Sequence, residues 1–131
     1  MRAVLLALSL LVSTGVTVAA DLPSADASVI KSAGIPVYDQ AVFVIGNQDV
    51  GYRFATSQPP EAVRQWYQKK LPDWSLFDQY GSWILYKGKK GAGMSQIMAS
   101  RQVAVSTNEK MIEWHKLKKD MTTEIVIMVP K

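Results

Sequence analysis

The stretch TSQPPEAVRQWYQKKLPDW, which begins at Thr56, constrains the fold more than any other part of the chain. Pro59 and Pro60 suit the first turn of a helix, where a missing N–H group is harmless. Pro72 ends the helix because it disfavours helical geometry at the residue before it. Apolar residues at spacings of three and four share one helical face, and here they are Val63, Trp66, Tyr67 and Leu71. The sequence therefore predicts an amphipathic helix over residues 59–71 that buries this face in a core.

The charged residues of this segment agree with a helix that begins near Pro59 and ends near Leu71. Glu61 lies where the helix dipole favours an anion, and Lys69 and Lys70 lie where it favours cations. The residues off the apolar face are expected to meet water: Glu61, Arg64, Gln65 and Gln68.

Segments with strand-like alternation flank the helix on both sides. Before it, AVFVIGNQDVGYRFATS predicts a hairpin that turns at Gly-Asn-Gln-Asp, and Tyr52 and Phe54 should point into the core. After it, DWSLFDQYGSWILYKG predicts a second hairpin that turns near Gly81. Near the end of the chain, MTTEIVIMVP predicts a strand in which Ile125 and Ile127 share one face.

Two connections complete the order of elements. KGKKGAGMSQIMAS is rich in glycine and lysine and is expected to be mobile, whereas EKMIEWHKLKKD has weak helical spacing. The segment RQVAVSTN between them predicts a short strand. The resulting order is β-β-α-β-β-(loop)-β-(α)-β. It predicts an α+β fold in which an antiparallel sheet of about five to six strands carries one main helix on one face.

Residues 1–20 have the layout of a secretory signal peptide. Arg2 precedes an apolar run, and small residues lead to Ala20, after which cleavage is predicted. An uncleaved membrane anchor is the alternative, although the run is short for a span of about 20 residues. The sequence thus predicts a periplasmic or secreted protein with no transmembrane span in the mature chain.

The rest of the chain divides into a small, polar lead-in over residues 21–35, expected to be flexible with a short helical turn near Val29 as an alternative, and a single α+β domain over residues 36–131. Loss of Arg2 with the signal peptide leaves 14 of the 15 basic side chains against 11 acidic ones, a formal charge of +3. This mild charge favours anionic partners slightly and does not predict nucleic-acid binding. Since the chain has no cysteine, its stability depends on the core rather than on disulfides, and cysteine nucleophiles and thiolate metal sites are excluded.

The stretches FATSQPPEAVRQWYQKKLPDW, YGSWILYKG and MTTEIVIMVP resemble a group of small exported bacterial domains of unknown function. In these domains a strand ending in Thr leads into Pro/Glu-Val, an aromatic–Tyr pair and Leu-Pro-x-Trp. The matching residues are Thr56, Pro60, Glu61, Val63, Trp66, Tyr67, Leu71 and Trp74. The resemblance spans residues 37–130. It implies an α+β fold and an exported location, and it supplies no catalytic residues.

Catalytic motifs are sparse. His115 is the single histidine, with Glu113 or Asp120 as a candidate triad partner, and no Gly-x-Ser-x-Gly motif accompanies it. Two pairs of carboxylates have spacings that a glycosidase could use, namely Asp73 with Asp78 and Glu109 with Glu113. An envelope hydrolase that uses His115 or a carboxylate pair is therefore one alternative. Isolated surface side chains are the simpler interpretation.

The sequence predicts no cofactor and no metal site. It contains no Gly-rich phosphate-binding loop followed by a helix. Soft ligands such as Met111 with His115 could hold Cu(I), but methionine more often fills a core.

Lysines gather in the two connections, and they predict a site for an anionic partner: Lys87, Lys89, Lys90, Lys116, Lys118 and Lys119. Six charges converge if both connections leave the same end of the sheet, and solvated loops are the alternative. A further alternative is a glycan-binding module, in which Trp83 or Trp114 is exposed and stacks on sugar rings instead of filling the core. Taken together, the sequence predicts a non-catalytic binding or accessory module of the cell envelope. Its partner would be an anionic envelope component or an envelope protein.

Overall fold

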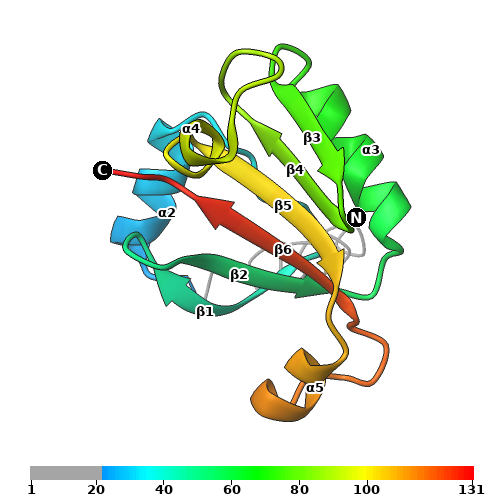
Figure 1. Cartoon of the computed structure of the whole chain (residues 1–131). Helices are drawn as coiled ribbons and strands as arrows, with labels where there is room; N and C mark the ends of the chain where they lie inside the picture. Colours follow the sequence, from blue (N-terminus) through cyan, green and yellow to red (C-terminus); the bar gives the residue numbers. More distant parts are fainter. Residues whose placement is uncertain (1–21) are drawn as a thin grey trace, which may run out of the picture.

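The structure of the protein, a computed structural model, describes residues 22–131 (Figure 1), so the predicted signal peptide lies outside the described residues. Its strands are β1 Val42–Asn47, β2 Gly51–Thr56, β3 Ser75–Gln79, β4 Ser82–Tyr86, β5 Gln102–Thr107 and β6 Thr123–Met128. Its helices are α2 Ser24–Ser32, α3 Pro60–Lys70, α4 Met94–Met98 and α5 Lys110–His115. The strands form one six-stranded antiparallel sheet in the order β1-β2-β6-β5-β4-β3. The α+β class and the antiparallel sheet predicted from the sequence are confirmed.

The last strand of the chain lies at the centre of the sheet. β6 pairs with β2 on one side and with β5 on the other, so the hairpins β1–β2 and β3–β4 form the two outer parts of the sheet. In the β2–β6 register, Tyr52 lies opposite Ile127 and Phe54 lies opposite Ile125. All four side chains are fully buried. A central position suits β6 because its four consecutive apolar residues, Ile125 to Met128, can be covered on both faces of the sheet.

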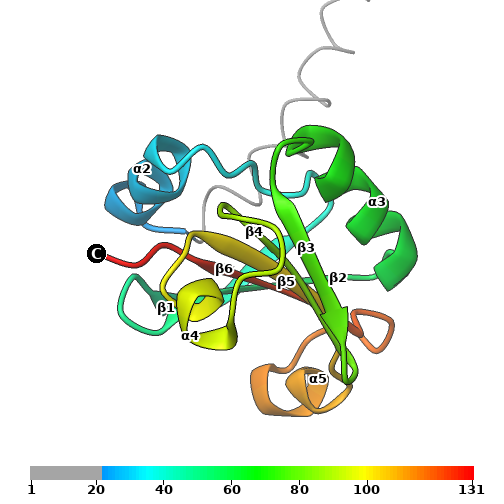
Figure 2. The ribbon, with the colours of Figure 1, turned by 45° about the horizontal axis from the view of Figure 1, so that its top comes forward.

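The helices cover both faces of the sheet (Figure 2). On the face that we call the inner face, α2 and α3 pack over Tyr52 and Phe54 and form the main core. The opposite face, the outer face, carries α4 and α5. There Ile97 of α4 packs against Ile84 and Tyr86 in a second, smaller core.

The apolar face of α3 is narrower than the sequence predicts. Val63 and Tyr67 are fully buried and Leu71 is buried. Trp66 is only partly buried and lies at the border of the core. Its ring meets the rings of Tyr38 and Tyr67 edge-on, with centroids 5.1 and 4.8 Å apart. Trp66 therefore closes the margin of the core rather than filling its centre.

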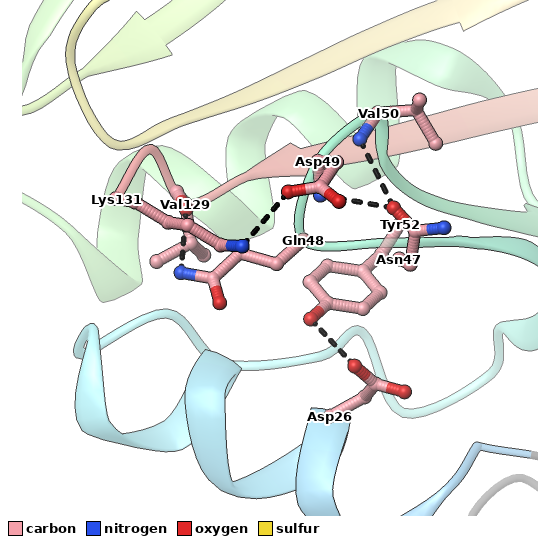
Figure 3. A network of polar contacts seen from close by, with 8 residues as sticks. All are labelled: Asp26, Asn47, Gln48, Asp49, Val50, Tyr52, Val129 and Lys131. Carbon is pink, nitrogen blue, oxygen red and sulfur yellow. Dashed lines mark hydrogen bonds and ion pairs between the residues drawn. The ribbon is translucent and has the colours of Figure 1, made fainter.

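The segment over residues 21–35, predicted to be a flexible lead-in with a helical turn near Val29 as an alternative, contains α2. Ile30 is almost completely buried in the main core, and Ile35 beyond the helix is buried as well. The hydroxyl of Tyr52 donates a 2.8 Å hydrogen bond to Asp26 Oδ1 (Figure 3). The sequence indicates at most a short turn here because its small residues give only a weak apolar stripe, and packing against the sheet stabilises the longer helix.

A polar network holds the β1–β2 turn against the end of the chain (Figure 3). Asn47 Oδ1 accepts hydrogen bonds from the backbone N–H groups of Asp49 and Val50. Gln48 Nε2 donates a 3.0 Å hydrogen bond to the carbonyl oxygen of Val129, and Lys131 Nζ lies 3.0 Å from Asp49 Oδ1. The side-chain turn at Asn47 fixes the predicted hairpin.

The hydroxyl of Tyr67 provides the first test of this core. It accepts a 3.2 Å hydrogen bond from the backbone N–H of Tyr38 in a buried position. Tyr67→Phe is expected to cost ~1–3 kcal/mol in the free energy of unfolding, because it leaves that N–H group buried without an acceptor. Chemical denaturation measures the change. The control is Tyr80→Phe at an exposed turn, which should stay within ~0.5 kcal/mol, and equal effects of the two changes would refute the role of the Tyr67 hydroxyl.

Buried tyrosines should also make the fold sensitive to alkaline pH. Burial, aided by the hydrogen bond to Asp26, raises the pKa of Tyr52 from 10.0 to about 12, and burial likewise raises the pKa of Tyr67. A tyrosine whose pKa is higher in the folded than in the unfolded protein stabilises the fold. This stabilisation is complete below about pH 10 and is lost as the pH rises toward 12. We expect each such group to lower the free energy of unfolding by about 1.4 kcal/mol per pH unit in that window.

The variant Tyr52→Phe separates the ionisation of Tyr52 from the titration of the lysines, because the lysines titrate in the variant and in the unsubstituted chain alike. Unfolding by denaturant at a series of pH values above 9 should show a shallower loss of stability for Tyr52→Phe than for the unsubstituted chain. Parallel curves would contradict the assignment.

Candidate ligand-binding cleft

A cleft of about 310 Å³ lies on the outer face of the sheet beside α5. Its lining residues are Ile45, Arg53, Asn108, Met111, Trp114, His115 and Glu124. Three neighbouring strands contribute to it, since Ile45 lies on β1, Arg53 on β2 and Glu124 on β6. Alternation along β2 sends Tyr52 and Phe54 inward and Arg53 outward, so the core pattern of this strand also positions the cleft.

The connection from β5 to β6 folds back to form one wall of the cleft. The backbone N–H of Asn108 donates a 2.8 Å hydrogen bond to the carbonyl oxygen of Thr122, which closes the base of the connection. The side-chain oxygen of Asn108 accepts from the N–H of Met111 in the first turn of α5, and Met111 is buried. At the other end Lys116 adopts a left-handed conformation, φ 51°, and terminates the helix. These contacts hold α5 against the sheet.

The floor of the cleft is a small polar cluster around Glu124. Arg53 Nη1 lies 3.0 Å from Glu124 Oε2, and Asn108 Nδ2 donates a 3.2 Å hydrogen bond to the same oxygen. The Glu124 side chain is 9% exposed, whereas that of Arg53 is 44% exposed. Among residues 22–131 no hydrogen bond ends at Glu124 Oε1. The cluster therefore fixes one carboxylate oxygen and leaves the guanidinium partly open to the cleft.

The rim of the cleft is apolar and exposed. Trp114 is 67% exposed and Ile45 is 51% exposed. Large apolar side chains that border a polar floor produce a site with two kinds of contact. A flat ligand face can stack on the indole, while polar groups of the ligand reach the floor.

His115 lines this cleft, but the predicted triad partners do not join it there. Within the part of the chain that the structure describes, no hydrogen bond or ion pair joins His115 to Glu113 or Asp120, and both acids are exposed. None of the acids in the two predicted carboxylate pairs lines the cleft either. The carboxylate that does so is Glu124, which the sequence did not single out. An acid directly before the apolar run of β6 was the available signal.

The six lysines of the predicted anionic site do not converge. Lys87, Lys89 and Lys90 lie in the connection that enters β5, while the other three, Lys116, Lys118 and Lys119, lie in the connection that leaves it. A strand separates its two ends in space, so the two clusters lie at opposite ends of β5 (Figure 1). All six side chains are exposed.

The tryptophans divide into core and surface residues. Trp83 is 5% exposed and belongs to the main core, so it cannot stack on a ligand. Arg64, which was expected to meet water, lies with its guanidinium carbon 5.7 Å from the centroid of the Trp83 ring and donates a hydrogen bond from Nη2 to the carbonyl oxygen of Val105. Trp66 and Trp74 are partly buried. Trp114 is the tryptophan that the fold leaves available to a ligand.

Two further findings concern residues 22–131 only. No helix in this range is long and apolar enough to cross a membrane. No group of three or more histidine, aspartate or glutamate side chains in this range lies close enough together to hold a metal ion.

No protein-family model matches the chain, and neither curated proteins nor solved structures give a significant match. The resemblance to small exported domains therefore rests on its sequence motif, and the function must be argued from the cleft.

The ion pair on the floor of the cleft should contribute measurably to stability. In a double-mutant cycle with Arg53→Met and Glu124→Leu, we expect a coupling of ~1 kcal/mol, because Glu124 is largely buried while solvent around Arg53 screens the interaction. The control cycle uses Asp49 and Lys131, an exposed pair whose Oδ1 and Nζ atoms are 3.0 Å apart, and its coupling should be below ~0.5 kcal/mol. Denaturant unfolding of the unsubstituted chain and the six variants measures both couplings, and equal couplings would show that burial of Glu124 adds nothing.

Proposed function

We propose that the protein is an exported, non-catalytic binding module of the cell envelope and that the cleft beside α5 binds a carbohydrate. The observation that carries this proposal is the exposed indole of Trp114 on the rim of a cleft whose floor holds Arg53, Asn108 and Glu124. Export is supported by the signal-like layout of residues 1–20.

The chemistry of the cleft suits a sugar ring. A sugar presents an apolar C–H face that can stack on an indole, and a rim of hydroxyl groups that need partners. The guanidinium of Arg53 and the amide of Asn108 donate hydrogen bonds, and the carboxylate of Glu124 accepts them. The volume of about 310 Å³ lies at the lower end of the range for small-molecule sites, which is roughly 300–1,000 Å³. It therefore suits one sugar residue or the end of a chain.

Trp114→Ala tests the proposal. Binding of soluble cell-wall glycan fragments, followed by titration calorimetry, should weaken by on the order of 30-fold, as expected for a central aromatic contact worth about 2 kcal/mol. The matched control is Tyr80→Asn, which removes an exposed aromatic outside the cleft at a position of left-handed backbone, φ 53°, where asparagine is tolerated. It should bind like the unsubstituted chain. Equal binding by the Trp114→Ala protein would overturn the proposal.

An envelope hydrolase is the second candidate, because His115 and Glu124 line the same cleft. Glycoside hydrolysis ordinarily needs two carboxyl groups across the scissile bond. Glu124 is the one carboxylate among the lining residues, and it is held by Arg53 and Asn108. We therefore expect binding without release of reducing ends. Release that is abolished by His115→Ala in a folded protein would put the hydrolase in place of the binding module.

A further inference from the structure

A second surface with a different chemistry lies at the end of β5 that is remote from the cleft. The connection between β4 and β5, residues 87–101, carries four cations and no acidic residue. The four are Lys87, Lys89, Lys90 and Arg101, and every one of them is exposed. Such a run attracts anions through its summed field.

The connection, which its composition predicts to be a mobile loop, contains α4 and is held by hydrogen bonds near both of its ends. The hydroxyl of Tyr86 donates a 2.8 Å hydrogen bond to the carbonyl oxygen of Lys89, and Ser75 Oγ donates a 2.7 Å hydrogen bond to that of Gly88. The backbone N–H of Lys87 donates to the carbonyl oxygen of Arg101, which closes the base of the connection. The backbone is held at these points, so the cations stay close to one another. Binding therefore costs less conformational entropy than it would for a free loop.

The same connection also exposes apolar surface. Within α4, Ile97 is fully buried against the sheet, whereas Met94 and Met98 are each 48% exposed. Residues four apart lie on the same side of a helix, so the two methionines form one small apolar patch beside the cations. Apolar side chains next to cations are the pattern of segments that lie at a membrane interface.

Arg101 connects this surface to an open cleft of about 360 Å³. The polar lining residues of that cleft are Ser28, Ser32, Gln48 and Arg101, and none of its lining residues is acidic. Hydroxyl, amide and guanidinium groups are donors to phosphate oxygens. The cleft therefore matches the charge of a lipid headgroup phosphate.

We propose that residues 87–101, together with the cleft at Arg101, dock the protein on an anionic phospholipid membrane. The lysines and Arg101 contact headgroup phosphates, and Met94 and Met98 enter the boundary between headgroups and acyl chains. This surface and α5 lie at opposite ends of β5 (Figure 1). Docking therefore leaves the cleft beside Trp114 open, and the inference does not depend on the ligand of that cleft.

The test compares two triple variants with the same change in charge. The protein, as recovered from the cells that express it, is co-sedimented with vesicles of phosphatidylglycerol and with vesicles of phosphatidylcholine, at low and at physiological salt. Any affinity of residues 1–20 for lipid is common to all variants, so the comparison between variants is independent of it. Lys87→Gln/Lys89→Gln/Lys90→Gln should lose on the order of 100-fold in partition to phosphatidylglycerol, about fivefold for each lysine. Lys116→Gln/Lys118→Gln/Lys119→Gln should lose little.

The expected binding weakens as salt rises, because the charges are exposed and screened. No preference for phosphatidylglycerol at low salt, or equal losses for the two triple variants, would overturn the proposal. All variants change exposed side chains, and unchanged thermal unfolding shows that they remain folded.

Met94→Ser/Met98→Ser distinguishes a membrane from a soluble polyanion. A membrane site predicts severalfold weaker partition to phosphatidylglycerol for this variant, since binding scales with the apolar area inserted. Polyphosphate in solution has no acyl region and serves as the comparison. Unchanged vesicle binding by the methionine variant, with polyphosphate bound as tightly as the vesicles, would replace the membrane with a soluble polyanion.

Discussion

The pairing of β2 with β6 is the constraint on which the rest of the structure depends. Its register places Tyr52 and Phe54 opposite Ile127 and Ile125 in the main core. Because side chains alternate along a strand, the same register places Arg53 on the outer face, where it meets Glu124 at 3.0 Å. A slip of one residue would expose the aromatic pair and bury the ion pair. The core and the candidate cleft are therefore two faces of one strand pairing.

The chain closes this core without disulfides by bringing its N-terminal part back onto the sheet. α2 adds Ile30 to the main core, and Tyr52 holds Asp26 through its hydroxyl. The buried hydroxyl of Tyr67 similarly holds the backbone at Tyr38. Polar groups of large aromatic side chains thus take part in joining the layers. Ionisation of Tyr52 at high pH removes the proton that it donates to Asp26 and places two negative charges together.

The sites of the two proposed functions lie at opposite ends of β5. The connection that enters this strand carries the cations and methionines of the proposed membrane surface, and the connection that leaves it forms the wall of the cleft with Trp114. An antiparallel strand places successive connections at opposite ends of a sheet. One end can therefore hold the protein at a surface while the other end meets a ligand.

The sequence by itself determined α3 and the strands, but not α2 or α4. Pro59, Pro60 and Pro72 set the limits of α3, and period-two alternation identified the strands and the inward direction of Tyr52 and Phe54. Only the tertiary structure decided which of the similar side chains are available. Trp83 and Trp114 are equivalent in the sequence, yet the first lies under α3 and the second lies on the cleft. α2, the partial burial of Trp66 and the separation of the lysine clusters depended equally on contacts between distant segments. Periodicity reports which side of an element is apolar, whereas exposure depends on what the rest of the chain places against that side.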